Sequence, residues 1–219
     1  MDLLNLSVDE ALTTTRNVRK RLDLTRPVDR GVVEECLGLA LQAPNGSNQQ
    51  TWEWIAVDDP QTRAQLAELH RESLKVFLAD GQADAARLAI ENGRNSRMME
   101  IGESVLYLIE HLHEVPVLLV PAVHTPTRLE GAHVFYQASI WGSIIQAVWS
   151  FMLALRERGL GSAWTTLQLW QERETAELLG IPYDSYTQVG LFPIAYTKGT
   201  DFRPAQRRPV SEVLHWNRW

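Results

Sequence analysis

The spacing of apolar residues predicts helices in the first third of the chain. Ser7-Val8-Asp9-Glu10 is a capping-box pattern, which indicates the start of a short helix. Asp29 is typical of an N-cap, and the apolar residues after it recur with helical spacing to about residue 42. Asp59 followed by Pro60 predicts another helix start, because proline suits the first helical position. The buried face of the second helix is expected to comprise Val32, Val33, Cys36, Leu37, Ala40 and Leu41.

Shorter apolar runs predict buried strands. They lie at residues 54–57, 115–123 and 187–196. In the second run, Pro116 and Pro121 disfavour a fully paired central position for those two residues, because proline cannot donate to a strand ladder.

The order of these elements predicts an α+β fold. Residues 61–112 have a mostly helical pattern, residues 159–166 form a turn into an extended segment, and residues 172–179 predict a short helix ended by Gly180. Strands and helices do not alternate regularly, which argues against a doubly wound sheet. We therefore expect one domain over residues 1–219, with a small mixed, mainly antiparallel sheet flanked by helices.

The longest apolar segment, residues 132–155, contains no Asp, Glu, Lys or Arg and is long enough to span a bilayer. Its polar residues Ser139, Ser143, Gln146 and Ser150 form a stripe on one helical face. That pattern favours a helix buried on all sides within a protein over a membrane span. We predict a dimer built around this helix; the alternative is that the sheet of the same chain covers it.

The formal net charge of −6 argues against general nucleic-acid binding, which needs a broad basic surface. Positive charge is instead concentrated at residues 16–21 and at Arg203, Arg207 and Arg208. These clusters are either solvated faces or a site for a small anion. The single cysteine, Cys36, allows no intrachain disulfide, and the N-terminus does not have the pattern of a signal peptide, so we expect a cytoplasmic protein.

Candidate catalytic and metal-binding side chains are scattered. His111 and His113 are two residues apart, so they do not share a helical face, and no nearby cysteine completes a metal site. We expect no metal and assign surface or core roles to all six histidines. The uncharged polar loop at residues 43–52 ends in a tryptophan and suits a flat polar heterocycle, whereas residues 16–21 suit a phosphate.

Five segments, in this order, resemble the FMN-dependent nitroreductases. They are residues 16–21, 43–52, 159–164, 179–182 and the stretch from the Gly190-bearing strand to Val213. The resemblance covers nearly the whole chain. It implies a nitroreductase-like α/β sandwich and a homodimer, with one FMN in each of two clefts at the interface.

The resemblance also assigns residues to the cofactor. Arg16, Asn17 and Arg19 would bind the FMN phosphate and the pyrimidine end of the flavin, with Asn17 standing where the family usually has serine. Thr165, Thr166 and Leu167 would lie near flavin N5. From the other subunit would come Pro44, Asn45, Gly46 and Asn48, and Arg207 and Arg208 would complete the phosphate site.

No protein side chain is expected to act as the catalytic group, because the flavin carries the chemistry. The resemblance implies a ping-pong reductase in which NADPH or NADH reduces the flavin and a nitroaromatic, quinone or similar small molecule then takes the hydride. The alternatives are a flavin store or sensor with little turnover and a reductive dehalogenase-like branch. A cover over the flavin is expected at residues 84–100. Candidates for a 2′-phosphate contact are Arg71, Lys75, Arg87, Arg94 and Arg97.

Overall fold

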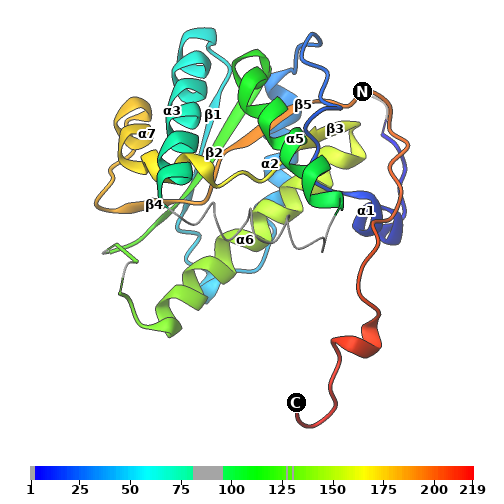
Figure 1. Ribbon diagram of the computed structural model, residues 1–219. Coiled ribbons are helices and arrows are strands. Elements are labelled where there is room, and N and C mark those ends of the chain that lie inside the picture. Colours follow the sequence, from blue (N-terminus) through cyan, green and yellow to red (C-terminus); the bar gives the residue numbers. More distant parts are fainter. Residues whose placement is uncertain (1–2, 81–95, 127, 130) are drawn as a thin grey trace.

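A five-stranded antiparallel sheet lies between two layers of helices (Figure 1). The computed structural model describes residues 3–80, 96–126, 128–129 and 131–219. The strand order is β1-β2-β5-β3, and β4 also pairs with β2. This arrangement confirms the predicted α+β class. The strands are β1 (Trp52–Val57), β2 (Val117–His124), β3 (Leu160–Ser162), β4 (Tyr186–Gln188) and β5 (Phe192–Tyr196).

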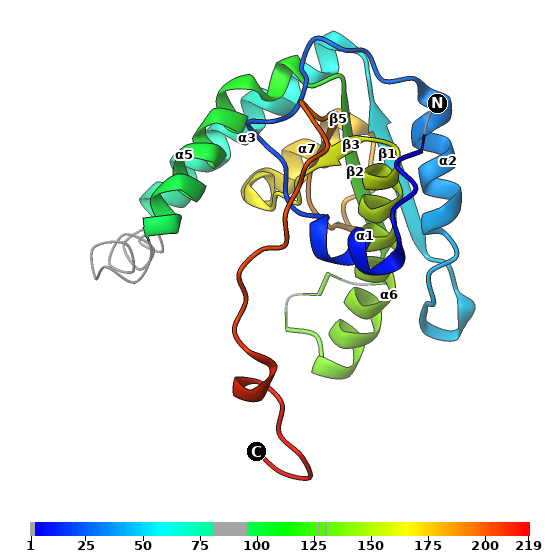
Figure 2. The same ribbon diagram turned by 90° about the vertical axis from the view of Figure 1, so that its right-hand side faces the viewer.

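The helices divide between the two faces of the sheet. In Figure 2, α2 and α6 lie on one side of the sheet and α3, α5 and α7 on the other. The α-helices are α1 (Val8–Thr14), α2 (Arg30–Ala40), α3 (Pro60–Ala79), α5 (Ser96–His111), α6 (Val134–Glu157) and α7 (Glu172–Leu179). Short 3₁₀ segments are η1 (Gly46–Asn48), η2 (Leu112–Glu114), η3 (Leu167–Gln171) and η4 (Val210–Glu212).

The helix caps read from the sequence are confirmed. Ser7 and Glu10 form a reciprocal capping box at α1, with Ser7 N donating to Glu10 Oε2 at 2.8 Å. The Asp29 side chain accepts from Gly31 N at 2.8 Å, and the Asp59 side chain accepts from Thr62 N at 2.7 Å.

The buried face of α2 is narrower than predicted. Val33, Cys36 and Ala40 are buried, and Val32 and Leu37 pack against them in part. Leu41, the C-cap residue of α2, is 38% exposed although its backbone is still helical.

Two hydrophobic cores follow from the two-residue period of the strands. In β2, Val117 and Leu119 belong to the core beneath α2 and α6, whereas Leu118 and Val120 belong to the core beneath α3 and α5. Both faces of β2 are therefore covered, which explains its continuous apolar sequence.

The prediction that proline would keep residue 121 out of a fully paired central position is confirmed: β2 lies in the middle of the sheet, but Pro121 pairs with Trp54 of β1 on one side and with neither β4 nor β5 on the other. Its missing N–H falls where the partner of β2 changes from β4, which pairs at residues 122–124, to β5, which pairs at residues 117–119. The Pro121 carbonyl still accepts from Val189 N at 2.9 Å. Pro116 precedes the strand.

The predicted strand 187–196 is interrupted. It forms β4 and β5, and Gly190 lies between them with a φ of 152°. This left-handed backbone region favours glycine, and the break turns residues 189–191 toward the segment that follows β3.

Within one chain, α6 is not buried on all sides. From Ile144 onward it contributes seven buried residues to the core beneath α2 and α6, whereas Phe135 is 67% exposed and Tyr136 is 60% exposed. By length and composition alone, α6 could also cross a membrane. The sheet of the same chain therefore covers only the second half of α6, and the dimer around this helix stays a prediction.

Candidate functional site

A pocket opens between α3, α5 and the segment that follows β3. It brings together four residues predicted from the sequence: Arg19, Thr165, Thr166 and Leu167. The remaining lining residues come mainly from α3 and α5 and from the aromatic side chains that flank residues 165–167. These are His70, Phe77, Val105, Leu108, Trp164 and Trp170.

Two hydrogen bonds hold the basic segment, residues 16–21, against β3 and the residues that follow it. Val18 N donates to Ser162 O at 2.8 Å, and the Asn17 side-chain oxygen accepts from Trp164 N at 2.9 Å. Gly161 allows this approach, because a Cβ there would lie 3.0 Å from Val18 Cβ and 2.7 Å from Thr197 Cγ2. Asn17 therefore positions the Trp164 backbone, which is a role that the resemblance did not assign.

Trp164 and Thr165 are held from the other side by the break at Gly190. Thr165 and Leu191 exchange two backbone hydrogen bonds of 3.1 and 2.9 Å, and Trp164 Nε1 donates to Val189 O at 3.1 Å. The Thr165 hydroxyl donates to Leu191 O at 2.8 Å. Among the described residues, the backbone N–H of Thr166 donates to no group, so it is available to a ligand.

Three arginines surround the ring of Phe202 next to this segment. The guanidinium carbons of Arg16, Arg21 and Arg156 lie 5.9, 4.3 and 5.0 Å from its centroid. Arg21 is paired with Asp201 at 2.5 Å. In the described part of the chain, Arg16 Nε and Nη2 are buried without a hydrogen-bond partner.

Arg156 is a residue that the sequence reasoning missed. It is 6% exposed, and it donates to Thr14 Oγ1 at 3.3 Å and to Thr200 O at 3.0 Å. Burial lowers the pKa of Arg156, and the neighbouring Arg16 and Arg21 lower it further. The surplus of positive charge around a small hollow, together with unpaired Arg16 donors, fits an anion. In the sequence, the only indication of a special role for this residue is that Arg156 is the first charged residue after the uncharged segment 132–155.

Arg19 extends from the basic segment into the larger pocket. Its Nη1 donates to Ser104 Oγ of α5 at 3.4 Å, and its Nε is buried without a partner among the described residues. Burial lowers the pKa of Arg19, yet an arginine remains charged at neutral pH.

His70 lies in the same pocket and was assigned only a surface or core role from the sequence. It is 1% exposed, and its Nδ1 has no hydrogen-bond partner among the described residues. Burial lowers the pKa of His70 to about 4, so the imidazole is neutral at pH 7.

The loop residues Pro44, Asn45, Gly46 and Asn48 do not line this pocket within one chain. The loop packs on α6, where Gly46 N donates to Ser143 Oγ at 2.9 Å. The Asn45 side chain accepts from Gln50 N at 2.9 Å. This loop lies on the α6 side of the sheet, so its contribution to a site in a second copy stays a prediction.

Arg207 and Arg208 are not brought to Arg16 within one chain. They lie in a C-terminal segment that extends away from the body of the protein (Figures 1 and 2). Arg208 Nε pairs with Glu212 at 3.2 Å, and Arg207 donates to Gln206 O at 3.2 Å. Their role in a phosphate site stays a prediction.

Most of the predicted cover lies outside the described residues, as do Arg87, Arg94 and the side chain of Arg97. Arg71 pairs with Glu68, and Lys75 pairs with Glu72 at 2.5 Å. No cluster of three metal-binding side chains occurs in the part of the chain that the structure describes.

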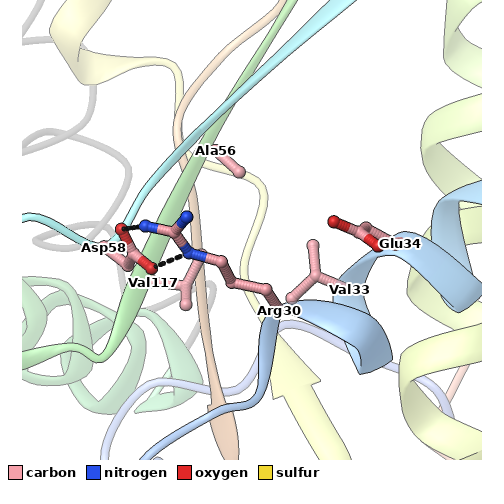
Figure 3. A pocket seen from close by; sticks show the side chains of 6 residues that line it. All are labelled: Arg30, Val33, Glu34, Ala56, Asp58 and Val117. Atoms are coloured by element: carbon pink, nitrogen blue, oxygen red, sulfur yellow. Dashed lines mark hydrogen bonds and ion pairs between the residues drawn. The ribbon is translucent and has the colours of Figure 1, made fainter.

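A second hollow lies between the start of α2 and the sheet (Figure 3). Its polar feature is a two-contact ion pair, in which Arg30 Nε and Nη2 donate to the Asp58 carboxylate at 2.5 and 2.8 Å. None of the predicted site residues lines this hollow.

Comparisons with known proteins define the class. An iodotyrosine deiodinase from Thermotoga neapolitana is 27% identical over 179 residues, which is 81% of each chain. A solved structure of iodotyrosine deiodinase bound to FMN and 3-iodo-L-tyrosine is 23% identical, covers 94% of this chain and 96% of that one, and has a TM-score of 0.67. The solved structure of the FMN and NADPH-dependent nitroreductase NfnB from Sphigopyxis sp. strain HMH is 19% identical, covers 98% of this chain and 100% of that one, and has a TM-score of 0.69.

The chain therefore shares the fold of these two proteins, and FMN is bound in the deiodinase of known structure. The model of the Nitroreductase family matches residues 12–196. The chain belongs to the nitroreductase family, as its sequence resemblance indicated.

Proposed function

We propose that this protein is an FMN-dependent oxidoreductase that takes hydride from NADPH or NADH and passes it to a nitroaromatic, quinone or similar acceptor. The observation that carries the proposal is the pocket that joins Arg19 to residues 165–167, beside an Arg16 guanidinium with unpaired buried donors. The NADPH dependence of NfnB supports the choice of donor.

In this proposal, Arg16 binds the phosphate group of the cofactor. Its Nε and Nη2 supply two directed donors, and Arg156 adds a buried positive charge that an anion offsets. The buried hydroxyl of Ser162, which lines the same small hollow, also has no partner among the described residues. The phosphate thus relieves both the crowding of positive charge and the unpaired polar atoms.

Arg19 and the Thr166 N–H would lie beside the ring of the cofactor, because both belong to the same pocket. When bound, the flavin supplies two-electron transfer through its N5 atom. A fixed positive charge from Arg19 favours an electron-rich ring, and the Thr166 N–H is a donor that needs no side-chain movement. Trp164 and Trp170 line the pocket next to these groups.

The proposed active form is a cytoplasmic homodimer. Each site would combine residues 16–19 and 165–167 of one chain with residues 44–48 of a second copy, and Arg207 and Arg208 would close the phosphate site. The exposed apolar side chains at the start of α6 are the surface that such a partner would cover.

A second candidate activity is reductive dehalogenation of an aromatic compound. The deiodinase relative matches 81% of this chain, and this supports that alternative. The two activities share a cofactor site and differ in the acceptor. A flavin store with little turnover is the third reading, and it predicts slow oxidation of NAD(P)H.

The test is a visible absorption spectrum of the purified protein, followed by anaerobic addition of NADPH. A flavin spectrum that bleaches supports the oxidoreductase, and one that does not bleach supports storage. No flavin spectrum after reconstitution with FMN refutes both. Anaerobic incubation of the reduced protein with 3-iodo-L-tyrosine separates the candidates, because dehalogenation replaces C–I by C–H, consumes two electrons and a proton, and releases iodide.

A further inference from the structure

The inner wall of the pocket beside residues 165–167 is aromatic and apolar except at one point. His70 and Phe77 are seven residues apart on α3, so they lie on the same helical face two turns apart. The rings of Phe77 and Trp170 have centroids 6.4 Å apart, and Val105 and Leu108 of α5 complete the wall. A flat, unsaturated ring fits such a lining better than a flexible polar chain does.

His70 supplies the polar point in this wall. Its Nδ1 is buried and, among the described residues, unpaired. The nearby Ser73 hydroxyl is satisfied by Leu69 O at 2.8 Å, so it does not need His70. Because buried polar groups in folded proteins nearly always have a partner, an unpaired one that lines a pocket points to a ligand.

The His70 side chain carries no charge at neutral pH. The apolar surroundings lower the pKa of His70 to about 4. A neutral imidazole has one N–H donor and one acceptor nitrogen, so it pairs with an uncharged hydroxyl but gives no ion pair to a carboxylate. Arg19 is the charged side chain among the described residues that line the pocket.

We infer that the α3 and α5 side of this pocket, next to the proposed place of the flavin ring, binds a planar aromatic acceptor whose uncharged hydroxyl substituent hydrogen-bonds to His70. The inference rests on the proposed oxidoreductase function and narrows its substrate class. His70 is then a specificity residue. It selects the hydroxyl-bearing ring, and it takes no part in the transfer of electrons.

The experiment compares two acceptors that differ by one hydroxyl, 4-nitrobenzyl alcohol and 4-nitrotoluene. We measure kcat/KM for each with the FMN-loaded protein and NADPH. The wild-type protein is expected to favour the alcohol by about three- to tenfold, the effect of one hydrogen bond between neutral groups. In His70→Leu, the ratio is expected to fall to about one, because leucine keeps the apolar packing and removes the polar atom.

Two further variants separate specificity from structure. His70→Asn keeps a polar atom close to the position of Nδ1, so it is expected to retain most of the preference for the alcohol. Gln168 is a matched control, because it is also 1% exposed with both amide atoms unpaired among the described residues, but it does not line the pocket. Gln168→Leu is expected to keep the wild-type ratio.

Several results would overturn the inference. One is a His70→Leu protein that keeps the wild-type ratio of the two kcat/KM values, including one that loses activity equally toward both acceptors. Another is a His70→Asn protein whose ratio matches that of His70→Leu. A wild-type protein that NADPH bleaches but that reduces neither nitro compound also overturns it, and leaves the proposed oxidoreductase in place. A flavin that NADPH does not bleach refutes the proposed function itself.

Discussion

Replacing Gly190 by alanine is expected to displace the segment that forms the floor of the pocket. Gly190 has a φ of 152°, a conformation that residues with a side chain rarely adopt. An alanine Cβ would lie 2.6 Å from Thr165 O and 2.8 Å from Trp164 Nε1. The first of these is a backbone atom held by its hydrogen bond from Leu191 N, so it cannot move without breaking the pairing of residues 165 and 191.

The expected loss of stability has two sources. The backbone conformation costs about 1–3 kcal/mol for a residue other than glycine. The steric overlap adds about 1–3 kcal/mol, as is usual when a methyl group is forced into a packed site. For a domain of this size, each kcal/mol corresponds to about 2–4 °C in Tm, so the variant should melt about 5–20 °C lower.

Gly38→Ala is the matched control. Gly38 is exposed on α2, and a Cβ there meets nothing within 4 Å. Alanine is a better helix former by about 1 kcal/mol, so this variant should melt at or slightly above the wild-type Tm. The Tm of each variant is measured by circular dichroism, and the FMN that each variant retains is measured after gel filtration. A Gly190→Ala protein with wild-type Tm and full FMN content would refute this account of the Trp164–Thr165 segment.

Four further predictions follow from single contacts. Arg16→Met should weaken FMN binding about 10- to 100-fold in a fluorescence titration, whereas Arg30→Met, which removes an exposed ion pair on the other side of the sheet, should not. Burial lowers the pKa of His70 from 6.5 to about 4, so between these pH values His70 is protonated in the unfolded chain but not in the folded one. The free energy of unfolding should therefore fall by up to about 3 kcal/mol as pH falls through this range. His70→Leu should remove this part of the pH dependence. Cys36, 0% exposed with its pKa raised to about 11 by burial, should resist thiol reagents at pH 8 until the protein is unfolded. Ser143→Arg should yield monomers in sedimentation velocity, because it places an unpaired charge in the proposed dimer interface; a dimeric Ser143→Arg protein would contradict the placement of α6.

Local signals in the sequence predicted local structure well. The capping box at Ser7, the Asp29 and Asp59 caps, and the αL conformation of Gly180 with a φ of 69° each depend on residues a few positions apart. The family resemblance also pointed to Arg19 and to residues 165–167, which line one pocket, and their role in cofactor binding stays a prediction.

Residues whose role depends on distant partners could not be predicted in this way. Arg156 joins the arginines around Phe202 only because α6 ends beside Phe202 and Thr200. His70 is one polar residue on an ordinary amphipathic helix until the turn at residues 164–170 closes over it. Pro121 indicated that its position is not paired on both sides, but that the break falls between β4 and β5 depends on a segment far along the chain.

In the proposed dimer, the position of the loop at residues 44–48 links cofactor binding to association of the two chains. Gly46 N is held by Ser143 Oγ of α6, so the loop is anchored to the same helix whose first turns expose Phe135 and Tyr136. A second copy that covers those side chains would bring its own loop along with its α6. In this proposal, FMN therefore binds the dimer more tightly than the monomer, so FMN binding and dimerisation stabilise one another by mass action. On this reasoning Ser143→Arg should lose FMN together with the dimer, even though Arg16 and Arg19 are untouched. A monomeric variant that keeps wild-type FMN affinity would show that one chain alone completes the site.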